Sequence, residues 1–245
     1  VRPGCLWLAE TVHRSFGAAC RAAGMTCARD SEAFEAFGME YEYDIQEAFV
    51  RYLKGEIPLS CYLDLLDFQE NIYPQNYDKL RFLENHDVPR IASHVKSESD
   101  LRNHTAMLYF NKGTTLVYAG QEAACSHLPS LFDRDTVDWN TGVDLSDLMR
   151  HMTKIKHEEL DADDALFVAA DDENDIAVLR REHDGRRKVG VFSLKSRSAE
   201  VEVPLPDGTY ENLVDGSSIT MRDGKLACAG TPIVLAVDVE RAWGV

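Results

Sequence analysis

The chain has 245 residues, of which 44% are hydrophobic, enough for one large domain or two modest ones. Its net charge of −16 at pH 7 and its pI near 4.9 argue against nucleic acid and anionic membranes as partners, because phosphates would be repelled. No apolar run is long enough for a transmembrane helix, and no signal peptide is visible. The scattered cysteines form no metal-binding pattern with histidine, which predicts free thiols in a reducing cytoplasm and no metal site; they are Cys5, Cys20, Cys27, Cys61, Cys125 and Cys228.

Up to about residue 160, short strand-like runs alternate with amphipathic helical patterns, which predicts β-α units. The expected strands cover residues 5–9, 39–45, 80–83 and 114–118. The expected helices cover residues 12–23, 47–54, 60–69, 100–110 and 145–155, with a long polar loop at 123–142 before the last one. Because each strand is almost continuously apolar or aromatic, we expect a parallel sheet that is buried on both faces.

Beyond residue 160 the pattern changes. An acidic, turn-rich segment at 161–175 is followed by short alternating strands at 176–179, 188–194, 201–205 and 233–239. Asp-Gly pairs, which favour tight hairpins, begin at residues 184, 207, 215 and 223. We therefore expect an α/β domain over residues 1–160 and an all-β antiparallel β-sandwich over residues 161–245.

Three of the expected strands end in polar and charged groups. The first run, Leu6-Trp7-Leu8-Ala9, ends in Glu10. The third is followed by Glu84-Asn85-His86-Asp87-Val88-Pro89-Arg90, and the fourth by Ala119-Gly120-Gln121-Glu122. Strand ends at the mouth of a β/α barrel carry the chemistry of that fold, and the strand that finishes in Asn85-His86-Asp87 is similar to such a mouth.

These three runs, in this order, resemble the motifs after the fifth, seventh and eighth strands of the α-amylase superfamily, glycoside hydrolase family 13. The resemblance covers the whole chain, although Thr115 replaces a usual Pro and Ala119 a usual Tyr. It implies the C-terminal half of a (β/α)8 TIM barrel followed by a β-sandwich. It also implies a retaining reaction on α-glucosidic bonds of α-glucosides, malto-oligosaccharides or sucrose.

The resemblance implies a role for each candidate residue. Glu10 would be the general acid, and burial beside Trp7 would favour its neutral form. Asp87 would bind sugar hydroxyls and stabilise the positively charged transition state, and His86 would donate a hydrogen bond to the same sugar. Arg90 would bind at the sugar site by orienting neighbouring carboxylates or hydroxyls.

The nucleophile of the family has no counterpart in this sequence. It is an Asp within a Gly-Phe-Arg-x-Asp-like run after the fourth strand, and without it we expect a fragment with no useful turnover alone. No cofactor is expected, because the usual calcium ligands of the family also lie largely in the other half. Four strands of a closed barrel would expose two edges and an apolar interior, so we expect a homodimer or association with the missing barrel half.

Two other functions stay open. One alternative is a non-catalytic carbohydrate-binding or interaction module, and the other is the remnant of a glucosyl transferase or isomerase of the same superfamily. Glu122 is interpreted as a strand-end residue that ties the following loop to the barrel. Trp139 is either a packed side chain or a sugar-stacking platform, and Tyr41 and Tyr43 are expected to pack in the sheet.

Overall fold

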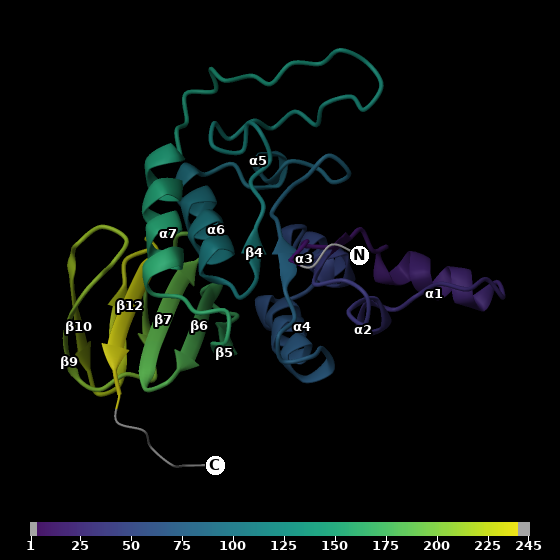
Figure 1. Cartoon of the computed structure of the whole chain (residues 1–245). Coiled ribbons are helices and arrows are strands. Elements are labelled where there is room, and N and C mark those ends of the chain that lie inside the picture. Colours follow the sequence, from purple (N-terminus) through teal and green to yellow (C-terminus); the bar gives the residue numbers. More distant parts are fainter. Residues whose placement is uncertain (1–3, 240–245) are drawn as a thin grey trace.

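The computed structural model describes residues 4–239, in which one parallel sheet and its helices lie beside two antiparallel sheets (Figure 1). The parallel sheet has the order β1-β2-β3-β4, the same as the order along the chain. Its strands are β1 (Leu8–Ala9), β2 (Met39–Tyr41), β3 (Lys79–Arg81) and β4 (Thr114–Thr115). The helices are α1 (Arg14–Ala22), α2 (Asp30–Ala33), α3 (Tyr43–Leu53), α4 (Leu59–Ile72), α5 (Ile91–His94), α6 (Glu98–Phe110) and α7 (Ser146–Glu158). Four parallel strands with intervening helices confirm the predicted half of a β/α barrel.

The strands are shorter than their sequence patterns predicted. The alternating run at 39–45 leaves the sheet after Tyr41, and α3 already begins at Tyr43. The fourth run pairs with β3 only through Thr114 and Thr115, because β3 itself ends at Arg81.

Strands β2 and β3 are largely buried, as expected, but their sides that pack against helices carry charged rather than apolar side chains. Lys79 Nζ lies 2.6 Å from Asp30 Oδ2 of α2 and 2.9 Å from Glu40 Oε2 of β2. Arg81 Nη1 donates to Gln69 Oε1 of α4 at 2.7 Å. Alternation along each strand places these side chains on one face of the sheet, where each buried charge has a partner of opposite sign or a hydrogen bond.

The C-terminal part is built from two antiparallel sheets. One sheet has the order β12-β7-β6-β5 and the other β8-β11-β10-β9, as predicted for a sandwich. Buried side chains of both sheets form a common core that includes Ile176, Val189, Val201 and Leu226. The strands are β5 (Ala165–Asp171), β6 (Ile176–His183), β7 (Arg186–Ser193), β8 (Ala199–Glu202), β9 (Gly208–Glu211), β10 (Ser218–Arg222), β11 (Lys225–Cys228) and β12 (Ile233–Asp238).

Strand β5 lies inside the segment 161–175 that was expected to be turn-rich. It pairs with β6 along its whole length, and its Leu166 is buried against the helices. The acidic composition of this segment hid the strand, because its pairing partner and its apolar contacts come from elsewhere in the chain.

Asp-Gly pairs form the predicted tight hairpins at two places. Asp184-Gly185 and Asp223-Gly224 both have positive φ at both residues, as a type I′ turn requires. The pair at residue 207 does not form a hairpin. There Gly208 begins β9, and the Asp207 carboxylate accepts the backbone N–H groups of the 223–224 turn at 2.9 and 3.0 Å.

One hydrophobic core joins the helices of the barrel half to the sheet β5–β7. The rings of Phe110 on α6 and Phe192 on β7 lie 5.6 Å apart, and both are fully buried. Arg181 of β6 donates to the carbonyl of Phe110 at 3.1 Å. The proposed domain boundary at residues 160 and 161 falls between α7 and β5 and stays a prediction.

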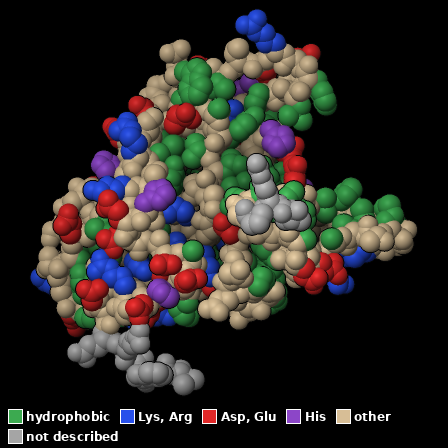
Figure 2. Space-filling view, viewed as in Figure 1, with side chains coloured by type: hydrophobic (Ala, Val, Ile, Leu, Met, Phe, Trp, Pro, Cys, Tyr) green, Lys and Arg blue, Asp and Glu red, His purple; other side chains and the backbone are tan. Residues whose placement is uncertain are grey.

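The barrel half leaves apolar groups uncovered. Among residues 4–239 no strand pairs with the outer edge of β1 or of β4. Leu6, Trp7 and Leu8 at the β1 edge and Phe16 on α1 are exposed, and Figure 2 shows hydrophobic side chains gathered over the projecting α1. Within the same described residues, no helix is both long and apolar enough to span a bilayer.

Candidate active site

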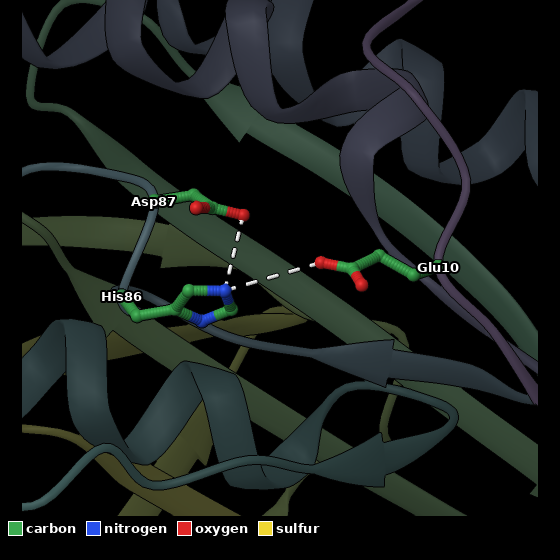
Figure 3. A group of neighbouring side chains, drawn as sticks. All are labelled: Glu10, His86 and Asp87. Atoms are coloured by element: carbon green, nitrogen blue, oxygen red, sulfur yellow. Dashed lines mark ion pairs between the residues drawn. The ribbon is translucent and has the colours of Figure 1, made fainter. Parts of the chain in front are cut away.

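Three of the predicted site residues meet at the carboxyl ends of β1 and β3 (Figure 3). His86 Nε2 lies 3.4 Å from Asp87 Oδ2 and 4.0 Å from Glu10 Oε1. Glu10 follows β1 directly, and the two others lie in the turn after β3. We call Glu10, His86 and Asp87 the strand-end cluster.

Tyr43 and Asn85 hold Asp87 in place. The Tyr43 hydroxyl donates to Asp87 Oδ2 at 2.9 Å and accepts from Asn85 Nδ2 at 2.9 Å. Asn85 Oδ1 in turn accepts the backbone N–H of Asp87 at 2.8 Å, which closes the turn. Burial, together with the neighbouring Asp87 carboxylate, raises the pKa of Tyr43, so the hydroxyl keeps its proton as a donor.

Sequence reasoning missed the contact that Tyr43 makes with Asp87. The ring of Tyr43 does pack, stacked on Tyr41 at 5.4 Å and edge-on to Phe82 at 5.4 Å, although Tyr43 begins α3 and does not lie in the sheet as expected. Its hydroxyl nevertheless reaches the strand-end cluster. The available signal was position, since Tyr43 follows the carboxyl end of β2 by two residues, where barrel side chains point to the mouth.

Glu10 is exposed in this chain, so its expected burial beside Trp7 is wrong. The Glu10 side chain is 59% accessible, and Trp7 is also exposed. The physical reason is that β1 is an edge strand with a neighbour, β2, on one side only among residues 4–239. His86 and Asp87 are also open to solvent, at 43% and 39%.

Arg90 lies beneath the cluster, and its burial does not fit the expected contact with a sugar. Its side chain is only 1% exposed and pairs with the fully buried Glu84, Nη1 to Oε1 at 2.6 Å. The guanidinium also lies 4.3 Å from the centre of the Tyr118 ring and donates through Nε to the carbonyl of His127 at 3.2 Å. Arg90 therefore orients a carboxylate, as expected, but one that belongs to the protein interior.

The loop after β4 begins with Glu122, whose carboxylate accepts the backbone N–H of Gly120 at 2.9 Å. Its backbone carbonyl accepts the N–H of Leu145, just before α7, at 2.7 Å. These bonds agree with the interpretation that Glu122 ties the loop to the barrel. Trp139 in the same loop is 54% exposed, so its interpretation as a packed side chain is wrong.

The strand-end cluster is also the set of residues that a metal ion could share, since one ligand atom from each lies within 4.8 Å of the others. A histidine nitrogen with two carboxylates does not suit calcium, which takes six to eight oxygen ligands. The residues of the strand-end cluster thus do not fit a calcium ion.

Comparison with known proteins follows the two parts of the fold. Residues 33–167 match the family described as the α-amylase catalytic domain, and residues 167–235 match the bacterial α-amylase C-terminal domain. "Alpha-amylase 2" of Dictyoglomus thermophilum is 23% identical over an alignment of 199 positions, and the match covers 72% of this chain and 33% of that protein.

Solved structures show the same relationship. An α-amylase from Lactobacillus plantarum is 34% identical, with a TM-score of 0.87 over 96% of this chain and 56% of that one. A maltogenic α-amylase from Thermotoga neapolitana shares the fold at 22% identity and a TM-score of 0.78, over 97% of this chain and 56% of its own. The chain thus spans between a third and somewhat more than half of the length of these relatives. Because the catalytic-domain match covers more than half of the sequence, the chain belongs to the α-amylase family, glycoside hydrolase family 13.

Proposed function

We propose that this chain carries one half of a retaining glycosidase site for α-glucosidic bonds, and that it turns over no substrate alone. The observation that supports it is the strand-end cluster, in which a carboxylic acid from β1 and a histidine and carboxylate from β3 converge. Glu10 is assigned as the general acid, and His86 and Asp87 as the groups that bind the sugar and stabilise its positive charge.

The chemistry needs a second, nucleophilic carboxylate that attacks the anomeric carbon. Asp87 is not assigned that part, because it lies in the motif after β3 that carries the supporting carboxylate of the resembled family. Covering the open face would also remove Glu10 from water, as proton donation by a carboxylic acid near neutral pH requires. The α-amylases matched above suggest malto-oligosaccharides as the substrate class.

The exposure of all three cluster residues favours a second candidate function, sugar binding without catalysis. Both functions predict that the chain binds a short α-glucan through His86 and Asp87. Calorimetric titration with maltotriose should give measurable heat, which His86→Ala or Asp87→Asn abolishes. His157→Ala, a change of an exposed histidine on α7, is the control and should leave binding intact. Unchanged binding in His86→Ala would rule out both assignments.

We also propose that another polypeptide covers the open edges, either a second copy of the chain or the complementary barrel half. The support is the exposed apolar group at the β1 edge, Leu6, Trp7 and Leu8, together with the unpaired backbone of that edge. Sedimentation velocity should show association that Leu8→Lys weakens. A sharply monomeric profile at high concentration would contradict self-association.

A cytoplasmic location belongs to the same proposal. All six cysteines are free thiols, and Cys5 and Cys61 are exposed, which suits a reducing compartment. Fractionation of cells that produce the protein, followed by thiol labelling without prior reduction, tests this location.

A further inference from the structure

We propose that Lys156 is a nucleophilic amine that accepts an acyl group from a small acyl phosphate, which makes it a modification site separate from the strand-end cluster. Lys156 lies on α7 and lines a cavity of about 620 Å³. The lining also includes Asp78, Gly113 and Thr114, at the amino ends of β3 and β4, and Arg181 of β6. The strand-end cluster follows the carboxyl ends of the same sheet, so this inference does not depend on the proposed function.

Lys156 is half-buried and lacks the acid partner that lysines withdrawn from water usually have. Its Nζ donates to the carbonyls of Tyr109 at 2.9 Å and of Asn111 at 3.0 Å. Among residues 4–239, no ion pair joins Lys156 to a carboxylate, whereas Lys79 and Lys188 each have a carboxylate oxygen 2.6 Å from Nζ. A cation held only by neutral carbonyls is less stable than a paired one, so Lys156 gives up its proton more readily.

A second cationic group lies beside Lys156. Arg181 Nη1 donates at 3.4 Å to the carbonyl oxygen of Asn111, the same oxygen that accepts from Lys156. Arg181 pairs with Asp164 at 3.1 Å, but Lys188 pairs with the same carboxylate at 2.6 Å, so two cations share one acid. The positive charge that remains beside the cavity favours a donor with an anionic leaving group such as phosphate.

Asp78 is the carboxylate whose charge acts on Lys156, and both of its oxygens are already engaged. They accept the backbone N–H and the hydroxyl of Thr114, each at 2.8 Å. Burial lowers the pKa of Lys156 to about 7, the positive charges of Arg181 and Arg81 add to this effect, and the charge of Asp78 opposes it only weakly. The amine is therefore largely neutral near pH 7, with a lone pair that can attack an electrophile.

The hydrogen bonds of Lys156 indicate the class of electrophile. The lone pair of Nζ attacks the carbonyl carbon of the acyl phosphate, and a C–N bond forms. The bond from that carbon to the phosphate oxygen breaks, its electron pair leaves with the phosphate, and the phosphate takes the proton that the nitrogen loses. The amide product is uncharged and keeps one N–H for the carbonyl of Tyr109 or Asn111. A neutral imine formed with an aldehyde would keep no N–H for either carbonyl.

Acetylation of the full chain by acetyl phosphate at pH 7.5 tests the inference. An ordinary lysine, with a pKa of about 10.4, is neutral in only about 0.1% of molecules at that pH. Burial of the Lys156 nitrogen reduces its advantage, and we expect peptide mass spectrometry to show Lys156 acetylated about tenfold faster than Lys154, or more. Lys154 is the matched control, because it lies on the same helix, is 69% accessible and has Glu158 at 3.8 Å.

The same reaction in guanidinium chloride separates the fold from the local sequence as the cause. In the unfolded chain both lysines should react at the same rate, because the burial and the neighbouring charges are lost. Equal rates in the folded chain, or a preference for Lys156 that persists in the unfolded chain, would overturn the proposal. The folded chain acetylated at Lys156 should melt no lower than the parent chain, because an uncharged amide replaces a cation without an acid partner. A lower melting temperature would show that the cavity does not accept the acyl group, and would overturn the proposal as well.

Discussion

Replacement of Arg90 by Met removes one partner of the buried ion pair between Arg90 and Glu84, and so tests how much this pair stabilises the fold. The Glu84 carboxylate is fully buried and has two partners, Arg90 Nη1 at 2.6 Å and the backbone N–H of Ile91 at 2.8 Å. Met keeps most of the aliphatic volume and leaves Glu84 with only the backbone bond. Removing one partner of a buried ion pair costs about 3 to 5 kcal/mol, so we expect a loss of that size in the free energy of unfolding near pH 7.

The same substitution should make stability depend on pH. Burial raises the pKa of Glu84 and the Arg90 guanidinium opposes the rise, so the pKa climbs further in Arg90→Met. When the folded pKa exceeds the unfolded one, the folded state binds the extra proton. The penalty is therefore full above the raised pKa and shrinks as the pH falls through it. Changing Glu84 to Gln in the same chain should recover much of the loss at neutral pH.

Urea unfolding followed by circular dichroism at pH 7.5 and pH 5 measures both effects. The control is Arg102→Met, because Arg102 makes an exposed ion pair with Glu98 at 3.0 Å, one helical turn away on α6. Exposed pairs of this kind contribute about 0.5 kcal/mol or less. The reasoning predicts that Glu84, buried without its partner, is the cause of the lost stability. It would be refuted if Arg90→Met lowered the free energy of unfolding by less than about 1 kcal/mol, or by the same amount at both pH values.

Three further predictions concern the core, a strand end and the site. Burial against Phe49 and other core side chains lowers the pKa of His104 to about 4, so the unfolded state binds more protons between about pH 6.5 and pH 4. About 3 kcal/mol of stability should be lost as the pH falls through that window, and urea titrations of His104→Phe should lack this component. Gly113→Ala should lower the melting temperature much more than Gly24→Ala. Both glycines have positive φ, but only at Gly113 would a Cβ lie 2.4 Å from a backbone oxygen. Tyr43→Phe removes the hydroxyl that positions Asp87, so calorimetry should show weaker maltotriose binding, with about 1 to 2 kcal/mol less stability; unchanged affinity would show that Asp87 needs no such support.

The half-barrel and the sandwich could be predicted because their signals are local. Apolar runs, helical periodicity and turn residues such as Asp184-Gly185 lie within a few positions of the elements that they specify. Where the identity of a residue depends on a distant partner, the pattern misleads. Lys79 sits in a strand because Asp30 and Glu40 neutralise it, and β5 forms in an acidic segment because β6 pairs with it.

The candidate site shows the same division. Glu10, His86 and Asp87 could be brought together from the sequence, because each follows a strand and parallel strands end at one edge. The burial of Arg90 could not be predicted from the sequence, because it depends on contacts of its guanidinium with Glu84, Tyr118 and the carbonyl of His127. The exposure of Glu10 could not be predicted either, because it follows from the absence of a neighbouring strand on the outer side of β1 among residues 4–239.

Hydrolysis of a chromogenic α-glucoside by the purified chain, beside Glu10→Gln, tests most directly whether the chain holds only part of a glycosidase site. Without a nucleophilic carboxylate, both proteins should release product at the same background rate. A parent chain that turns over the substrate, and loses this activity in Glu10→Gln, would contradict an incomplete site. It would mean that a nucleophile is present within the chain or its assembly.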